Sequence, residues 1–117
     1  MTTILFADDS VNIREFLRQE LQEEGYRVLL ARDGKEAIDM VESQRPDLAI
    51  LDIWMPRLGG LEAAVFIAAA DRGIPVILFT NNNDLCRFDP RTAFAAACVQ
   101  KNGDLAELKR TIVSLLA

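Results

Sequence analysis

The sequence contains no histidine among its 117 residues. This absence excludes Ser-His-Asp and Cys-His catalysis, histidine-ligated metal centres and a histidine proton switch near neutral pH. There are two cysteines, Cys86 and Cys98, which are too few for a four-thiolate zinc site. One disulfide is arithmetically possible, but a chain of this length can build its core without one, and nothing in the sequence indicates an oxidising compartment. We therefore predict that Cys98 is a small packing residue rather than a redox sensor.

Long apolar runs and basic segments are also missing. The longest apolar run, residues 63–70, is far too short to cross a bilayer. The first ten residues lack the basic flank and the long apolar stretch of a signal peptide. The formal net charge of −5 argues against non-specific attraction to nucleic-acid phosphates. These absences predict a cytoplasmic protein that binds neither membranes nor nucleic acid directly.

The remaining composition is that of an ordinary globular domain, with 50% hydrophobic and 26% charged residues. Because no repeat or flexible linker interrupts the chain, we treat residues 1–117 as one domain. Charge is distributed unevenly: residues 1–58 hold 12 acidic and 7 basic side chains, whereas residues 59–117 hold 6 of each. The acidic excess of the first half indicates a local site.

Short apolar runs alternate with helical patterns five times along the chain. Strands are expected at residues 4–7, 27–31, 48–51, 75–79 and 98–100. The first helix is expected after Ser10 as N-cap, with Ile13, Phe16, Leu17 and Leu21 facing inward and Gly25 at its end. Further helices are expected after Asp33, over residues 61–70 and after Asp104. Strands that are apolar throughout and each followed by a helix predict a parallel α/β sheet with helices on both faces.

Polar residues stand where four of these strands end. Asp8 and Asp9 follow the first strand, Asp52 the third, Thr80 the fourth and Lys101 the fifth, and ligands bind beyond this edge of parallel sheets. Clustered carboxylates repel one another; Lys101 would offset one charge, and a hard divalent ion such as Mg²⁺ would offset the others. A carboxylate can also take up a phosphoryl group. The metal and the lysine would neutralise the charge on its oxygens, and the hydroxyl would donate a hydrogen bond to one of them. The pattern predicts phosphoryl transfer onto the protein itself.

From Ile4 to Leu116 the chain resembles the receiver domains of bacterial response regulators (CheY-like), which are the phosphoacceptor half of two-component signalling. The resemblance implies a flavodoxin-like (βα)5 fold with strand order 2-1-3-4-5. It implies that Asp52 is the phosphoacceptor, and Pro56 and Gly60 stand at the family's positions in the loop that follows.

The resemblance also implies roles for the other site residues. Asp9 and Asp52 would bind Mg²⁺ directly, Asp8 would hold it through water, and the backbone carbonyl of Trp54 would complete the protein's share of the coordination. Thr80 and Lys101 would contact the phosphoryl group.

The function implied is that of a stand-alone receiver, because Ala117 closely follows the last expected helix. A sensor histidine kinase or phosphotransfer protein would donate the phosphoryl group. Phosphorylation would change the affinity for a downstream protein, whose identity the sequence does not give, at the face made by the fourth helix, fifth strand and fifth helix. Homodimer formation stays open. We expect no enzyme activity beyond self-catalysed phosphorylation and slow autodephosphorylation.

Several residues depart from the family pattern. Cys98 stands where the family has an aromatic residue, Asn102 where proline is usual, and Asn81 where the residue is usually small. Pro90 predicts that the fourth helix begins late, which would leave residues 81–88 as a long loop. These departures keep open an alternative function, an interaction module with a silent or phosphorylation-independent output.

Three aromatic residues carry weaker predictions. Phe88 and Phe94 are expected in the core, where one of them would take over the role of the missing aromatic. Trp54 is either an exposed binding residue or a cover for the site. It also stands where hydrolases that use an aspartyl phosphate carry a second acid, which disfavours an enzyme of that class. The sequence contains no GxxxxGK[ST] loop, so no motif supports nucleotide binding.

Overall fold

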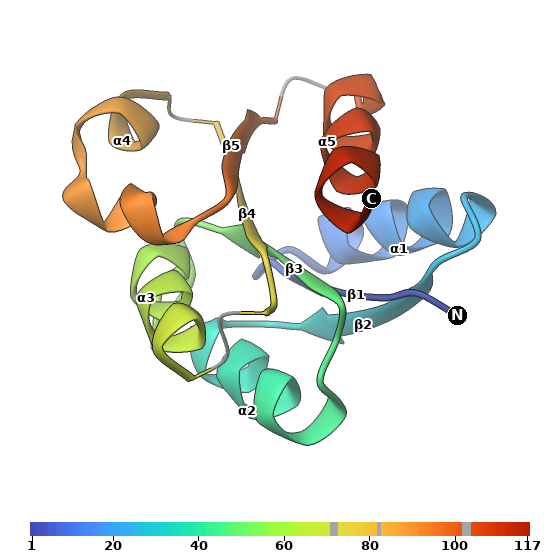
Figure 1. Ribbon diagram of the computed structural model, residues 1–117, viewed down its shortest axis with the longest axis horizontal. Coiled ribbons are helices and arrows are strands. Elements are labelled where there is room, and N and C mark those ends of the chain that lie inside the picture. Colours follow the sequence, from blue (N-terminus) through green and yellow to red (C-terminus); the bar gives the residue numbers. More distant parts are fainter. Residues whose placement is uncertain (71–72, 82, 102–103) are drawn as a thin grey trace.

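The computed structural model describes residues 1–70, 73–81, 83–101 and 104–117, and of residues 83–85 it describes only the backbone. Five parallel strands form one sheet in the order β2-β1-β3-β4-β5 (Figure 1), which confirms the predicted fold class. The strands are β1 (Thr3–Ala7), β2 (Arg27–Ala31), β3 (Leu48–Asp52), β4 (Val76–Thr80) and β5 (Ala97–Gln100). The helices are α1 (Val11–Glu23), α2 (Gly34–Gln44), α3 (Gly60–Ala70), α4 (Asn83–Phe88), the 3-10 helix η1 (Pro90–Phe94) and α5 (Ala106–Leu116).

Helices cover both faces of the sheet, as Figure 1 shows. Helices α1 and α5 cover one face, where Leu17 and Leu108 pack with Phe6 and Ile50 of the central strands. Helices α2 and α3 cover the other face, and their small buried residues lie close to the strands. Because β3 and β4 are buried along their whole length, the sheet offers solvent only its ends and edges. None of the described helices is long and apolar enough to cross a membrane.

The helix ends follow most of the predicted capping signals. The Ser10 hydroxyl accepts a hydrogen bond from the backbone N–H of Ile13 at 3.3 Å, and Gly25 has the positive φ of 93° that ends a helix without strain. The last helix begins later than predicted, because Leu105 occupies the N-cap position and Asp104 accepts a hydrogen bond from the Ala106 N–H.

Phe16 does not face the core as predicted, and 53% of its surface is exposed. Helix α1 packs on the sheet through Leu17 and Leu21, and Phe16 falls at the margin of that stripe. There it lines an open groove with Phe79 and Leu105, next to Lys101.

The region of the fourth helix differs from the prediction. Helix α4 occupies residues that were expected to form a loop, and Pro90 starts only the short 3-10 helix η1. Asp89 caps η1 by accepting a hydrogen bond from the Arg91 N–H, so the helix-start signal was correct but the helix type was wrong. Phe88 and Phe94 are 77% and 51% exposed, so the prediction that they lie in the core is wrong. The prediction about Asn102 lies outside the described residues.

Cys86 and Cys98 form a disulfide, with their Cα atoms 6.2 Å apart, which contradicts the prediction of a packing Cys98. The bond joins α4 to β5, two elements that meet only because β5 lies beside β4 at the edge of the sheet. Sequence reasoning missed the pair because it placed Cys86 in a loop of unknown path.

Candidate functional site

Three carboxylates meet at the ends of the two central strands. Asp8 and Asp9 follow β1 directly and Asp52 ends β3, and the pairing of Ala7 with Leu51 sets the two strand ends side by side. One carboxylate oxygen from each acid lies within 4.8 Å of the others. Asp8 and Asp52 are buried, whereas Asp9 is exposed. The structure therefore brings together the acids that the sequence predicted to be neighbours.

Lys101 extends from the end of β5 to these carboxylates. Its Nζ lies 2.8 Å from Oδ2 of Asp8 and 3.3 Å from Oδ1 of Asp52. The Lys101 backbone N–H donates to the carbonyl of Thr80 at 2.8 Å, and the ammonium group stands 5.6 Å from the centre of the Phe79 ring. The lysine thus extends past β4 to the buried acids, and its ammonium group offsets part of their negative charge, as the sequence predicted.

Thr80 and Trp54 also lie at this end of the sheet. Thr80 ends β4 and is buried, one residue beyond the position paired with Asp52. The backbone N–H of Trp54 donates to Oδ1 of Asp52 at 3.4 Å, while the residue as a whole is 65% exposed. Of the two interpretations of Trp54, the structure favours the exposed residue over the cover.

Burial dominates the electrostatics of Asp52. It raises the pKa of the Asp52 carboxyl above the ordinary value of 3.8; Lys101 opposes this rise and the charge of Asp8 adds to it. A carboxyl with a raised pKa in the folded state holds its proton at pH values where the unfolded chain has released it. The folded protein therefore loses stability as the pH rises between these two pKa values.

We expect Asp52→Asn to raise the free energy of unfolding at pH 7, by about 1 kcal/mol in metal-free buffer. Asparagine keeps the shape of the side chain but carries no charge into the buried site. Urea unfolding of both proteins across a pH series measures the difference, which should shrink as the pH falls and vanish below about pH 3, where the wild-type carboxyl is protonated in both states. A variant that is less stable than the wild type at pH 7 would contradict this account.

The loop after Asp52 is held by close backbone contacts. The Gly60 N–H donates to the carbonyl of Ile53 at 2.9 Å, and the Gly34 N–H donates to the carbonyl of Leu58 at 2.8 Å. A Cβ on Gly34 would lie 2.3 Å from that carbonyl oxygen, so only glycine allows this approach. The loop is therefore packed directly against the start of α2.

Sequence reasoning missed Arg57, which fixes the same loop. Its Nη2 lies 2.8 Å from Oδ2 of Asp33, 24 residues earlier, and its backbone has a positive φ of 65°. Burial alone would raise the pKa of Asp33, but the backbone N–H of Glu36 and the Arg57 guanidinium outweigh it and lower the pKa. Arg57 and Arg32 line an open hollow together with Asp9 and Asp33, so both charge signs meet beside the carboxylate cluster. An arginine in a loop gives no sequence signal for an ion-pair partner 24 residues away along the chain.

A second arginine fixes the end of β1. The Arg14 guanidinium in α1 donates to the backbone carbonyl of Asp8 at 2.7 Å. The Asp8 carboxylate also accepts a hydrogen bond from the Ser10 N–H at 2.9 Å. These contacts hold Asp8 in one position.

The donor set fits a hard divalent cation. Carboxylate and carbonyl oxygens are the ligands that Mg²⁺ prefers, and Mg²⁺ sites use few carboxylates together with waters or phosphate oxygens. Lys101 supplies one positive charge for three carboxylates, which leaves a local negative excess. The cluster can therefore bind a divalent ion.

These observations define a receiver. The family model for the response regulator receiver domain matches residues 4–113. The chain therefore belongs to this family, whose proteins act in two-component signalling.

Curated and solved relatives agree with this assignment. The chain is 44% identical over 77 residues to the response regulator MprA of Mycolicibacterium vanbaalenii, an alignment that covers 66% of this chain and 33% of MprA. For MprA of Mycobacterium tuberculosis the identity is 46%, covering 66% and 34%. The aligned region thus spans about a third of these relatives.

Two solved structures from Thermotoga maritima are similar over nearly the whole chain. The response regulator TrrA in complex with Mg²⁺-BeF has 41% identity and a TM-score of 0.95, covering 99% of this chain and 100% of TrrA. TrrA in complex with the histidine kinase ThkA gives 41% identity and a TM-score of 0.93, with both chains fully covered.

Proposed function

We propose that this receiver accepts a phosphoryl group on Asp52, with Mg²⁺ bound beside it, from a sensor histidine kinase or phosphotransfer protein. The observation that carries the proposal is the position of the Asp52 carboxylate, which lies 3.3 Å from the Lys101 ammonium and within 4.8 Å of carboxylate oxygens of Asp8 and Asp9 at the end of the sheet. The TrrA structures with Mg²⁺-BeF and with ThkA support it by similarity.

In this proposal a carboxylate oxygen of Asp52 attacks the phosphorus atom, and the bond to the donor breaks with its electron pair leaving on the donor. The product is an acyl phosphate on the protein. Lys101 and Thr80 stabilise the oxygens of the transferred group through charge and a hydroxyl hydrogen bond. Asp9, Asp52 and the Trp54 carbonyl would hold Mg²⁺, with Asp8 acting through water, and the ion would neutralise phosphoryl charge. No external substrate is turned over.

Phosphorylation replaces the single negative charge of the Asp52 carboxylate by an acyl phosphate of about −1.5 to −2 charge units, so it adds up to about one further negative charge at a site that already has a negative excess. The group would draw Lys101 and Thr80 toward it and so act on the segments next to them, β5 and the start of α4. We place the downstream protein partner on the face of α4, β5 and α5, where Phe88 is exposed. Homodimers would use the same face, and the proposal places the receiver in the cytoplasm.

Incubation with acetyl phosphate and Mg²⁺, followed by acid quench and intact mass measurement, tests the proposal. We expect one added phosphoryl group on the wild type and none on Asp52→Asn or in a metal-free sample. Asp39→Asn serves as the matched control, because Asp39 is an exposed carboxylate on α2 and its loss should leave labelling unchanged.

Labelling that persists in Asp52→Asn would refute Asp52 as the phosphoacceptor. A wild type that binds Mg²⁺ but never gains the group would favour the alternative function, a receiver-fold interaction module with a phosphorylation-independent output.

A further inference from the structure

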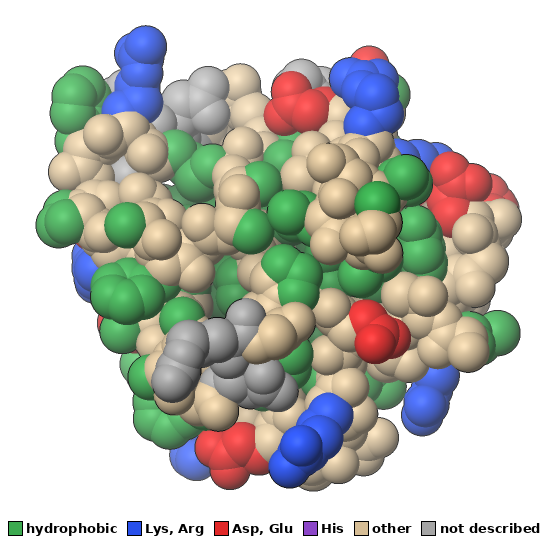
Figure 2. All heavy atoms as spheres, in the orientation of Figure 1, with side chains coloured by type: hydrophobic (Ala, Val, Ile, Leu, Met, Phe, Trp, Pro, Cys, Tyr) green, Lys and Arg blue, Asp and Glu red, His purple; other side chains and the backbone are tan. Residues whose placement is uncertain are grey.

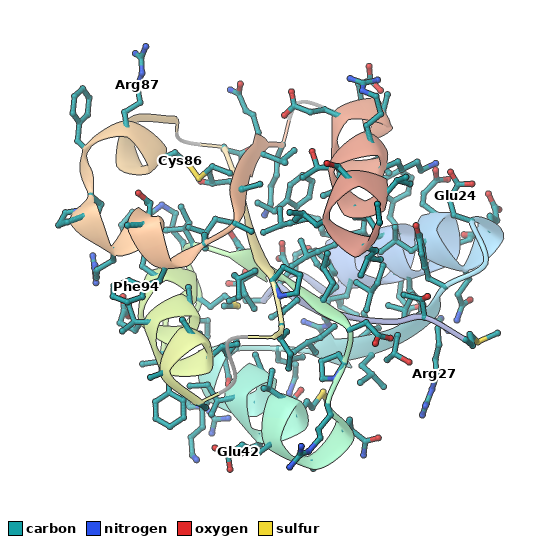
Figure 3. The ribbon with its side chains drawn as sticks, viewed as in Figure 1. Glu24, Arg27, Glu42, Cys86, Arg87 and Phe94 are labelled. Carbon is teal, nitrogen blue, oxygen red and sulfur yellow. A yellow bond between two sulfur atoms is a disulfide. The ribbon has the colours of Figure 1, made fainter. Side chains whose placement is uncertain are left out.

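The Cys86–Cys98 disulfide lies where solvent can reach it. Cys98 is an exposed residue of β5, the edge strand of the sheet, and Cys86 is half-buried on α4. Val99, the residue after Cys98 in β5, is buried with the α5 residues, so successive β5 side chains alternate between the two faces of the sheet. Figure 3 shows the sulfur atoms between α4 and β5. Disulfide exchange requires access of a thiolate to one of the sulfurs, and this geometry provides it.

The disulfide closes a loop whose described side chains are exposed or half-buried from residue 86 to residue 96. Cys86 and Ala95 pack against the core only in part, and the Ala96 N–H donates to the Val76 carbonyl of β4 at 2.7 Å. Arg91 pairs with Glu62 of α3 at 2.8 Å, and the Thr92 hydroxyl donates to the carbonyl of Asp89 at 2.8 Å. Both are polar contacts of exposed or half-buried groups, which resist local opening weakly. Figure 2 shows several hydrophobic side chains at the surface on the left of the view, where Figure 1 places α4 and η1.

Both cysteines lie on segments that connect along the chain to site residues. Cys98 lies three residues before Lys101, whose backbone N–H is bonded to the Thr80 carbonyl. Helix α4, which carries Cys86, begins three residues after Thr80. A bond between the two cysteines therefore fixes the relative position of the segments that leave the site.

We propose that Cys86–Cys98 is a redox modification site whose reduction releases the α4–η1 segment, residues 83–96, from β5. A thiolate of a small thiol or dithiol reductant attacks Sγ of the more exposed Cys98, the S–S bond breaks, and Cys86 leaves as a thiolate that takes up a proton. A second reductant thiol then attacks the mixed disulfide and frees Cys98 as a thiol. In total the protein gains two electrons and two protons and the reductant becomes a disulfide; a small disulfide oxidant reverses the exchange.

The test compares oxidised and dithiothreitol-reduced protein in native buffer. Because the chain has two cysteines, alkylation after reduction should add two labels without denaturant. Hydrogen exchange of the peptides over residues 86–96 should become faster, by up to about a hundredfold for a loop of this length, while α1 peptides stay unchanged. In the Cys86→Ser/Cys98→Ser variant, exchange should be fast in both conditions, which controls for other effects of the reductant.

Cysteines that stay unalkylated until denaturant is added, or equal exchange in the two redox states, would overturn the proposal. A second readout links the redox site to phosphorylation and rests on the proposed function. The affinity for Mg²⁺ with beryllium fluoride, followed by the fluorescence of the single tryptophan, Trp54, should differ about fivefold or more between the redox states. Equal affinities would overturn the link, whereas absence of binding in both states would refute the proposed function and leave the exchange data to decide on the redox site.

Discussion

Gly60→Ala should destabilise the protein by about 3 kcal/mol. Near the start of a helix, alanine would ordinarily be the more favourable residue, because glycine loses more backbone entropy on folding. Here the added Cβ would lie 2.1 Å from the backbone oxygen of Asp52 and 2.8 Å from its carbonyl carbon. These atoms belong to Asp52, which ends β3 and is paired with Phe79 of β4, so they cannot move away without disturbing the sheet. The sign of the effect is therefore the reverse of the helix preference.

Urea unfolding in metal-free buffer measures this change. Ser43→Ala is the matched control, because Ser43 lies exposed on α2 and its replacement adds helix preference without a close contact. That control should change stability by less than about 0.5 kcal/mol. A Gly60→Ala variant as stable as the wild type would show that the loop from Ile53 to Gly60 can shift away from the end of β3.

Lys101→Met should lower stability by about 3 kcal/mol in metal-free buffer. Methionine keeps the apolar stem of the side chain beside Phe79 but removes the ammonium group, so buried Asp8 loses its cation at 2.8 Å. Addition of Mg²⁺ should recover most of the loss, because the ion binds the folded carboxylates and stabilises that state by mass action. The variant should therefore gain more stability from Mg²⁺ than the wild type does.

Lys109→Met is the control for this experiment. Lys109 pairs with Glu20 at 3.1 Å and Glu24 at 3.9 Å on the surface, and neither partner is one of the three site carboxylates. Its replacement should cost little and leave the response to Mg²⁺ at the wild-type level. A Lys101→Met variant as stable as the wild type without metal would contradict this account, because it would mean that the buried carboxyl groups are protonated or in contact with water.

The strands and the carboxylate site could be predicted because both follow from local patterns. Apolar runs fixed the strands to within one or two residues, and the parallel arrangement then required that residues after them share one edge. Asp8, Asp52 and Lys101 needed only their position after a strand to be placed together.

The α4–η1 segment could not be predicted in the same way. Helix α4 has six residues, too few to show a clear apolar period, and the exposure of Phe88 is set by tertiary packing. The Cys86–Cys98 bond and the Arg57–Asp33 pair depend on where separate segments of the chain meet in space, which no short window of sequence contains. These residues needed the three-dimensional structure.

The order of the strands has a consequence for how the charges come together. Strand β1 lies between β2 and β3 in the sheet. These three strands and all three site acids are contained in residues 1–52, which precede β4 and β5 in the chain. Lys101 follows the strand that is added last, at the far edge. On any folding route that pairs β1 with β3 before β5 joins, the acids are gathered without the lysine. A cation taken from the solvent would be their neighbour first, and Lys101 would arrive at a site already occupied.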